Sequence, residues 1–310
     1  MHLEKYVVDN NILPPPTIDN YRAKPVYHNR SEGGLRCRGV FQKKGGSDKP
    51  LVSIITVVYN GEKYLENTFL SVLNQTYHNI EYIVIDGGST DCTLDIIKKY
   101  DNHISYWLSE PDEGISDAFN KGVSLASGDI IGIINADDWY EPDTVEKVIE
   151  RFSECNADVV HGDIRRAVEM IIPDEAMLRY EMAINHPTAF VTYRSYLKIG
   201  LFRNEFCYAM DYEWMLRAKD AGLSFSYINQ CLANMRLDGV SDRGWRMVLR
   251  EFLKVQDLHY PNQKLFNYLF FVFQIMKRTG RNVLEKMWLQ RVVRFYHAHS
   301  SLVRKYRIRA

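Results

Sequence analysis

Two adjacent carboxylates, Asp137 and Asp138, follow a short apolar run in this sequence, with Asn135 just ahead of them. The run at 130–134 contains four isoleucines and is typical of an interior strand. Like charges side by side repel each other, so the pair is best explained by a cation held between the carboxylates and an anionic group. The pattern predicts a metal-bound phosphate at the end of this strand.

Alternating strands and helices must position this pair. Strands are expected at 52–58, 82–85, 104–108, 129–134 and from 158 onward. Helices are expected after Gly61, at 93–100, at 116–126, after Pro142 and at 212–221. This alternation predicts an α/β fold, with a Rossmann-like, mainly parallel sheet and helices on both faces. The strands are continuous apolar runs, which is typical of a sheet covered on both sides.

Polar side chains come just after several of these expected strands. They are Asn60, Asp86, Glu110 and the group at 135–138. In open sheets of this kind, ligands bind outside the carboxyl ends of the strands. We therefore expect these residues to converge on one edge of the sheet.

The chain of 310 residues is long enough for one large domain or two modest ones. Its 39 Lys and Arg residues balance 39 Asp and Glu residues, so no net field favours a polyanion and no nucleic-acid partner is predicted. Five scattered cysteines without metal spacing indicate free thiols in a reducing compartment. Residues 1–20 have no apolar stretch, so no signal peptide is expected, and a cytoplasmic protein is predicted.

Five motifs, taken in order, resemble glycosyltransferase family 2, whose members have the nucleotide-sugar-binding GT-A fold. They are VSIITVVYN at 52–60, Asp86 with STD at 89–91, DAFNKG at 117–122, NADD at 135–138 and DYEW at 211–214. The resemblance runs from residue 52 to about 241. It implies a GT-A domain at 50–243, with a nucleotide-binding half at about 50–140 and an acceptor half at about 141–243. Residues 1–49 are expected to form an irregular N-terminal extension, and 244–310 a basic helical region.

The resemblance implies a UDP-sugar donor and assigns a set of residues to its nucleotide. They are Val57, Tyr59, Asp86, Asp91, Asn120, Lys121, Asn135 and Asp137. The Tyr59 ring would stack on the base, and the Asp86 carboxylate would accept the imino N–H of uracil. Each has a plainer alternative. Asp86 can be a turn residue and Asp91 a helix cap, while Lys121 can pair with Asp117 four residues earlier on a helix.

Asp137 and Asp138 correspond to the acidic signature of the family and are the predicted metal ligands. Hard oxygen ligands suit Mn²⁺ or Mg²⁺, which would neutralise the charge of a leaving nucleoside diphosphate. Asn135 replaces the first acid of the stricter Asp-x-Asp form. Its amide can bond a ribose hydroxyl but adds no charge.

Asp211 is the predicted catalytic base, because an inverting transfer needs a carboxylate that takes the proton of the attacking hydroxyl. Met210 stands where the family usually has a second acid, and Asp211 can also cap the helix that follows. The residues assigned to the acceptor side are His186, Glu213, Arg217 and Arg236. Arg236 precedes a segment, 239–241, that resembles the flexible loop with which the family closes over the donor.

The C-terminal region is strongly basic, with ten Lys or Arg residues and a single acid in 277–310. Helical spacing of Leu284, Trp288, Val292 and Phe295 predicts a basic amphipathic helix. Such a helix can lie on an anionic membrane surface, at the inner face of the cytoplasmic membrane, or it can pack on the domain or form a homodimer contact. The apolar run at 265–276 is too short to span a bilayer.

The leading hypothesis is a metal-dependent, inverting glycosyltransferase that adds one sugar to a glycan or lipid-linked oligosaccharide during surface-polysaccharide synthesis. The Gln-x-x-Arg-Trp signature of processive members is absent, which favours single-sugar addition. A nucleotidyltransferase of related fold would need a glycine-rich basic loop after the first strand, where this chain has YNGE at 59–62. A non-catalytic nucleotide-sugar-binding protein is the other alternative, supported by Asn135 and Met210.

Overall fold

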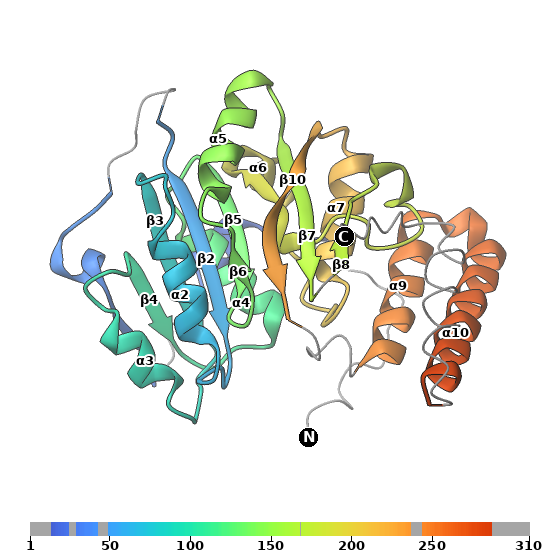
Figure 1. The fold of residues 1–310 in the computed structure, drawn as a ribbon, viewed down its shortest axis with the longest axis horizontal. Helices are drawn as coiled ribbons and strands as arrows, with labels where there is room; N and C mark the ends of the chain where they lie inside the picture. Colours follow the sequence, from blue (N-terminus) through green and yellow to red (C-terminus); the bar gives the residue numbers. More distant parts are fainter. Residues whose placement is uncertain (1–13, 25–28, 43–48, 168, 237–243, 287–310) are drawn as a thin grey trace.

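In the computed structural model, strands of the described residues form a single sheet that runs through the molecule, with helices on both sides (Figure 1). The structure describes residues 14–24, 29–42, 49–167, 169–236 and 244–286. The strands are β1 (Ser31–Gly33), β2 (Val52–Val58), β3 (Ile80–Asp86), β4 (Tyr106–Ser109), β5 (Ile130–Asn135), β6 (Trp139–Tyr140), β7 (Val159–Arg166), β8 (Glu169–Ile171), β9 (Phe190–Thr192) and β10 (Phe225–Met235).

The helices alternate with these strands through most of the chain. They are α1 (Ile18–Arg22), α2 (Leu65–Leu73), α3 (Thr93–Lys99), α4 (Ile115–Leu125), α5 (Thr144–Glu154), α6 (Tyr193–Ile199), α7 (Met210–Asp220), α9 (Trp245–His259) and α10 (Lys264–Lys286). Short 3₁₀ turns are η1 (Leu35–Arg38), η2 (Glu175–Met177), η3 (His186–Thr188) and η4 (Pro261–Gln263).

The strand order in the described sheet is β1-β4-β3-β2-β5-β9-β7-β10-β6, with β8 paired to β7. Strands β4, β3, β2 and β5 are parallel to one another, as are β7 and β10. Strand β9 joins these two groups by antiparallel pairing with both β5 and β7. The carboxyl ends of β2, β3, β4 and β5 therefore meet at one edge, as the sequence predicts.

Side chains of the central strand alternate between two hydrophobic cores. Ile55 and Val57 of β2 pack in the core that includes α4 and α7, while Val52, Ile54 and Val58 pack in the core that includes α2 and α5. All seven residues of β2 are buried. Burial on both faces explains why the strand reads as a continuous apolar run.

The predicted α/β class and the mainly parallel sheet are confirmed, and the bounds of β2 match the expected strand. The described residues before position 50 contain short regular elements within the extension that was expected to be irregular. Helix α1 packs on α4, and β1 adds an antiparallel strand to the edge of the sheet beside β4. The sequence did not reveal these elements, because a five-residue helix and a three-residue strand give almost no periodic signal.

Helices α9 and α10 lie side by side at one end of the molecule, beyond α7 (Figure 1). Among the described residues, no helix is long and apolar enough to cross a membrane. The basic helix predicted for the C-terminal region lies mostly outside the described residues, because 287–310 are not among them. The loop predicted at 239–241 also lies outside them.

Candidate functional site

A cavity of about 1030 Å³ opens at the carboxyl edge of the sheet. One wall is made by the ends of β2 and β5 and the first turn of α4, and the opposite wall by α7, α9 and α10. The predicted residues that line it are Val57, Tyr59, Asn135, Asp137, Asp138, His186, Asp211 and Arg236. These eight residues therefore line one cavity, which is larger than a typical small-molecule pocket. Of the residues that the strand-end rule named, Asn60 and those at 135–138 line it, whereas Asp86 and Glu110 do not.

Asp138 is held in place just past the end of β5. The Thr68 hydroxyl donates a hydrogen bond to its carbonyl at 2.7 Å, and the backbone N–H of Arg236 donates to its Oδ1 at 3.3 Å. The residue is only 2% exposed. Burial, and then the neighbouring charge of Asp137, raise the pKa of Asp138 to about 7. A buried carboxylate beside a second one is stabilised when a cation binds to both.

The donor set at this point fits a hard divalent cation. Oδ1 of Asn135, two positions before the pair, is buried and has no hydrogen-bond partner among the described residues. No third His, Cys, Asp or Glu in the described part of the chain joins the pair in a metal-binding group. Asp137 and Asp138 would thus hold a Mg²⁺ or Mn²⁺ ion whose other ligands come from a bound phosphate or water.

Arg236, the residue after β10, also lines the cavity. Its guanidinium lies 4.0 Å from the ring centroid of Tyr64 and 5.1 Å from that of Trp139, in cation–π contact with both. Its backbone N–H binds Asp138, and the two rings hold its guanidinium charge at the same end of the cavity as the acidic pair.

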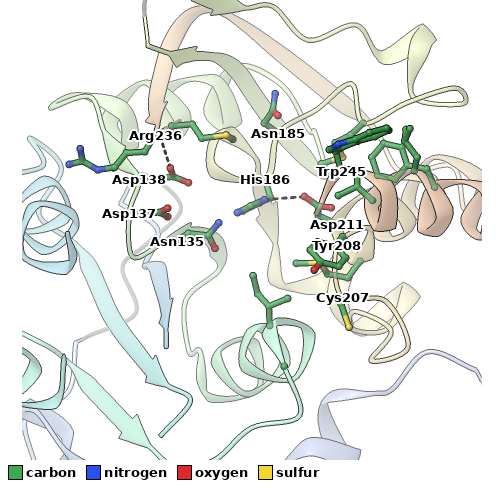
Figure 2. A pocket seen from close by; sticks show the side chains of 18 of the residues that line it. Asn135, Asp137, Asp138, Asn185, His186, Cys207, Tyr208, Asp211, Arg236 and Trp245 are labelled. Carbon is green, nitrogen blue, oxygen red and sulfur yellow. Dashed lines mark hydrogen bonds and ion pairs between the residues drawn. The ribbon is translucent and has the colours of Figure 1, made fainter. Parts of the chain in front are cut away.

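Asp211 faces this group from the other side of the cavity, at the start of α7. Its Oδ2 is 3.0 Å from Nδ1 of His186, and its Oδ1 accepts the backbone N–H of Tyr212 at 2.8 Å. Figure 2 shows the His186 ring between Asp211 and the Asn135–Asp138 segment. A carboxylate only accepts, so Nδ1 of His186 carries the hydrogen of this bond.

The sequence had assigned His186 to the acceptor sugar alone, without linking it to Asp211. The structure pairs the two side chains, which are 25 positions apart in the chain. Nε2 of His186 is buried and has no hydrogen-bond partner in the described residues. An imidazole that is oriented by a carboxylate and has an unsatisfied nitrogen is typical of a site that handles protons.

Asp86 does not line the cavity. The side chain is fully buried, and its oxygens accept hydrogen bonds from the Ser109 hydroxyl at 2.6 Å and from the N–H and hydroxyl of Ser89. These contacts are those of an acid that closes the turn after β3, which is the plainer of its two predicted roles. Asp91 is also away from the cavity wall and accepts the N–H groups of Thr93 at 3.0 Å and Glu62 at 3.2 Å, as a helix-capping residue does.

Asn120 points into the interior of the fold and not toward the cavity. Its amide donates to the Phe202 carbonyl at 2.8 Å, to Asn204 and to the Tyr21 hydroxyl, and its oxygen accepts the Phe202 N–H at 2.8 Å. The side chain is fully buried and its hydrogen-bonding groups are all used. Asn120 thus connects α4 to α1 and to the loop before α7.

Lys121 likewise forms ion pairs within the fold. Its ammonium group lies 2.9 Å from Glu110 and 3.4 Å from Asp117, and Asp117 also pairs with Lys24 at 2.6 Å. The predicted pairing with Asp117 is present, but it is buried, since Lys121 is 6% and Asp117 1% exposed. Neither Asn120 nor Lys121 lines the cavity, so the structure gives no support to their assignment to the nucleotide.

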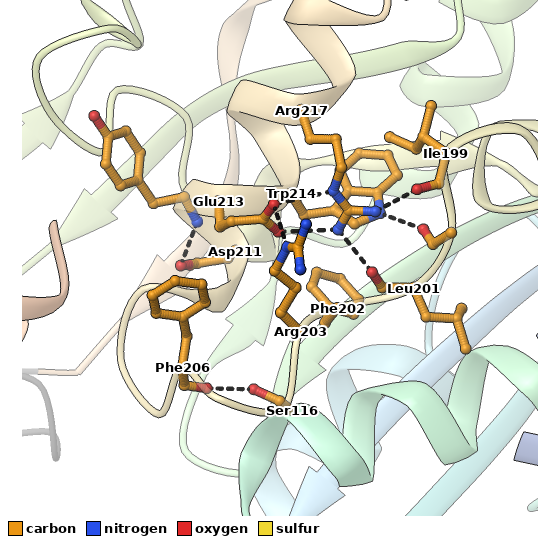
Figure 3. Close-up of polar contacts among 12 residues, drawn as sticks. Ser116, Ile199, Leu201, Phe202, Arg203, Phe206, Asp211, Glu213, Trp214 and Arg217 are labelled. Atoms are coloured by element: carbon orange, nitrogen blue, oxygen red, sulfur yellow. Dashed lines mark hydrogen bonds and ion pairs between the residues drawn. The ribbon is translucent and has the colours of Figure 1, made fainter. Parts of the chain in front are cut away.

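Glu213 and Arg217, which the sequence assigned to the acceptor, form a buried charge cluster away from the cavity (Figure 3). Glu213 is fully buried and bonds Arg203 at 3.0 Å and Arg217 at 2.9 Å, with His259 at 3.6 Å. Burial opposes its ionisation, but the hydrogen bond of His259 and the charges of both arginines outweigh this and lower the pKa of Glu213 to about 2. The motif at 211–214 does not reveal this cluster, because Arg203 and His259 come from other parts of the chain.

We expect Glu213→Gln to destabilise the fold by about 3–5 kcal/mol, because it leaves buried cations without their counter-charge. The matched control is Glu205→Gln, since Glu205 also pairs with Arg203 but is 42% exposed in its side chain, and we expect it to cost at most about 0.5 kcal/mol. Because the folded state lowers the pKa of Glu213, its ionised carboxylate stabilises the fold fully only at a pH above the pKa of the unfolded state. This stabilisation is lost as the pH falls toward 2. Urea unfolding at pH 7 and pH 3.5 should therefore show a smaller difference from wild type at the lower pH.

Several residues of the cavity wall were missed by sequence reasoning. Asp112 follows β4 by three positions, and the strand-end rule that pointed to Glu110 could have found it. Aromatic side chains from 180–252 and α10 form the wall opposite the acidic pair, namely Tyr180, Tyr208, Trp245, Phe252, Phe270 and Phe271. No motif marks these residues, because they come from separate elements whose packing the sequence does not reveal.

Comparison with known proteins gives the same picture of the fold. The chain is similar to chondroitin synthase of Escherichia coli, at 33% identity over 203 residues, which covers 61% of this chain and 29% of that protein. The chain spans only 16% to 47% of the length of the first three curated relatives it matches.

Two solved structures share the architecture at low sequence identity. One is S. aureus TarS 1–349 in complex with UDP, with a TM-score of 0.54, 20% identity, and coverage of 71% of this chain and 69% of that one. The other is a mannosyltransferase from Pyrobaculum calidifontis in complex with GDP-Man and Mn²⁺, with a TM-score of 0.54, 16% identity, and coverage of 77% and 68%. The model of the family described as glycosyl transferase family 2 matches residues 53–220, more than half of the chain. The chain therefore belongs to glycosyltransferase family 2.

Proposed function

We propose that the protein is an inverting, metal-dependent glycosyltransferase that moves one sugar from a UDP-sugar to a hydroxyl of a glycan acceptor. The observation that carries this proposal is that the Asp137–Asp138 pair and the Asp211–His186 pair line opposite sides of one cavity. An acidic pair suited to a metal diphosphate and a carboxylate suited to proton removal are the two groups that such a transfer needs.

The donor end of the cavity supplies charge stabilisation. Asp137 and Asp138 would hold Mn²⁺ or Mg²⁺, which when bound neutralises the charge that grows on the leaving nucleoside diphosphate. Arg236 adds a fixed guanidinium to the same end, and Tyr59, 64% exposed at the end of β2, offers a ring on which a base can stack. The solved relative with GDP-Man and Mn²⁺ supports the choice of metal, and TarS with UDP that of nucleotide.

The opposite side of the cavity supplies the base. In a single displacement, the acceptor oxygen bonds to the anomeric carbon, the bond from that carbon to the phosphate oxygen breaks, and the acceptor proton passes to Asp211. Both oxygens of Asp211 accept a hydrogen bond, from His186 and from the N–H of Tyr212, and each keeps a lone pair for the proton. His186 therefore fixes the direction of the carboxylate before the acceptor arrives.

The remaining parts of the proposal concern the acceptor, the domain organisation and the contacts of the C-terminal region. The aromatic wall suits the stacking of a sugar, so we assign the acceptor, a glycan or a lipid-linked oligosaccharide of surface-polysaccharide synthesis, to that side. The family-like domain is proposed at 50–243, with 244–310 as a separate helical region that supplies α9 and α10 to the wall. Peripheral contact of 277–310 with the inner face of the cytoplasmic membrane and formation of a homodimer are the two proposed roles for this region.

A panel of nucleotide sugars with Mn²⁺, read by thermal shift and by slow donor hydrolysis, tests the proposal. We expect at least one UDP-sugar to raise the melting temperature only when the metal is present, by the linkage between binding and stability. The same sugars with EDTA are the control. Failure of every UDP-sugar to stabilise the protein in the presence of Mn²⁺ would contradict the proposed donor.

A further inference from the structure

Helix α10 carries a large share of the exposed apolar side chains of the molecule. Of the twelve large hydrophobic side chains that are exposed in the described residues, six lie on this one helix. They are Leu265, Phe266, Tyr268, Leu269, Phe273 and Met276, with exposed fractions from 42% to 74%. Single exposed apolar residues are ordinary, but a contiguous group of them marks a surface that binds a partner.

The most exposed of these side chains share one face of the helix. Leu265, Leu269 and Met276 are spaced by four and seven residues, so they lie along a single stripe, and Tyr268 flanks it. The sequence has no charged residue at 265–276. At 1.5 Å per residue, this uncharged stretch is about 18 Å long. We call the surface formed by these four side chains the outer face of α10.

The opposite side of α10 is fixed against the rest of the molecule. Asn267 is only 3% exposed, and its amide donates to Asp257 of α9 at 2.9 Å. The ring centroid of Phe270 lies 5.9 Å from that of Tyr180. Figure 1 shows α10 as the outermost helix at its end of the molecule, with α9 between it and α7. The rotation of α10 is therefore set, and the outer face points away from the fold.

The charge of α10 indicates what covers this face. Its basic residues in the sequence are Lys264, just before the uncharged stretch, and Lys277, Arg278, Arg281 and Lys286 after it, against the single acid Glu285. Such a helix is attracted to an anionic surface. A second copy that met it face to face would bring cations against cations, which is unfavourable.

We propose that α10 docks the protein on an anionic membrane surface, with its outer face inserted among the lipid chains. The helix would lie in the plane of the membrane, because its apolar side chains run along its length and its cations stand at the ends of the uncharged stretch. Long basic side chains can reach the lipid headgroups from this depth, and Tyr268 suits the boundary between headgroups and chains. The proposal places a hydrophobic contact at 265–276, ahead of the basic region for which peripheral contact is proposed.

Docking through the outer face has a consequence for the acceptor. The other side of α10 lines the cavity with Phe270, Phe271 and Gln274, so lipid would lie about one helix diameter, or about 10 Å, from the cavity wall. A lipid-linked acceptor can then reach the cavity while its lipid stays in the bilayer. This consequence rests on the proposed function, whereas the docking itself does not.

Flotation of the full chain with vesicles tests the docking. Wild type should float with vesicles of equal parts phosphatidylglycerol and phosphatidylcholine, and much less with phosphatidylcholine alone. The double variant Leu265→Ser, Leu269→Ser should bind the anionic vesicles about 10-fold more weakly or less, because two leucines are withdrawn from the lipid. Both side chains are more than half exposed, so the fold should be kept. The matched control is Leu197→Ser on α6, 62% exposed, which should bind within about twofold of wild type.

A second readout separates insertion of this face from attraction of the basic C-terminal region. The variant Leu269→Trp places an indole on the outer face, and Leu197→Trp places one on α6. Vesicles that contain brominated lipid should quench the added emission of the first and not that of the second. If wild type does not bind anionic vesicles, if the double variant binds them as wild type does, or if Leu269→Trp is not quenched, the inference is wrong.

Light scattering on the same variants covers a second copy as the occupant. If wild type is a dimer in solution, and the double variant is a monomer that still binds vesicles normally, the outer face is a dimer contact and the inference is wrong. No nucleotide or metal enters these experiments. Failure of every UDP-sugar to bind would therefore contradict the proposed function alone, and failure of vesicle binding would contradict the docking alone.

Discussion

Asp138→Asn is expected to abolish the Mn²⁺-dependent binding of UDP. The change keeps the shape of the side chain, the hydrogen bond of Thr68 to the backbone carbonyl, and an oxygen that can accept the N–H of Arg236. It removes the buried charge that a divalent cation would neutralise. Loss of a metal ligand of this kind removes several kcal/mol of charge stabilisation, so UDP affinity should fall by at least about 100-fold. Titration calorimetry with UDP, with and without Mn²⁺, measures the loss.

The control for this substitution is Asp143→Asn, which makes the same chemical change at an acid that is 44% exposed in its side chain and pairs with Lys147. Its UDP affinity should remain that of wild type. Because a buried carboxylate without its cation is costly, Asp138→Asn should also be at least as stable as wild type in metal-free buffer. Unchanged metal-dependent binding in a folded Asp138→Asn protein would move the metal site elsewhere.

Asp211→Asn should leave donor binding within about twofold of wild type and reduce transfer by about 100- to 10,000-fold, the range that general base catalysis contributes. The amide cannot take a proton at the working pH, whereas the fold around it is kept by the N–H of Tyr212. Initial rates of UDP release, with an accepted acceptor and with water alone, measure the effect. Binding of UDP with Mn²⁺ gives the second readout.

The companion variant is His186→Gln, which retains a side-chain N–H that can point at Asp211. If Asp211 is the base and His186 orients it, this change should cost clearly less than Asp211→Asn. Transfer at a near-normal rate by Asp211→Asn would show that Asp211 is not the base. If instead His186→Gln loses as much as Asp211→Asn, the proton passes to Nε2 of His186, and Asp211 only orients the ring.

The sequence predicted the parts of this site that depend on local order. Where a parallel strand ends, the next residues must lie at the carboxyl edge, and this rule brought Asn60 and the group at 135–138 to the cavity. It does not show which side chains at that edge are used inside the fold, as those of Asp86 and Glu110 are. Hydrophobic runs also gave the central strands, because β2 and β5 are buried on both faces. These inferences need only the direction of each strand.

The residues that were assigned to the site but lie away from the cavity have hydrogen-bond and ion-pair partners that are far from them in the chain. Asn120 faces the donor in the family-based assignment, but its hydrogen bonds go to residues 82 to 99 positions distant, in α1 and in the loop before α7. Glu213 shares α7 with Asp211, yet two positions along a helix turn a side chain to a different face. Helical spacing shows which residues share a face, and it does not show whether that face meets the cavity or the arginines behind it.

The ends of the described sheet have a consequence for how the protein behaves in concentrated solution. Its outermost strands are β1, with three residues, and β6, with two, whereas the strands that they cover are longer. Short terminal strands offer few free backbone groups to a neighbouring molecule, which is a common protection against edge-to-edge aggregation. A truncated protein that starts at residue 50, where the family-like domain begins, would lose β1 and leave the edge of β4 uncovered. We therefore expect β1 to protect the parallel sheet from self-association, although no described residue before position 50 lines the cavity.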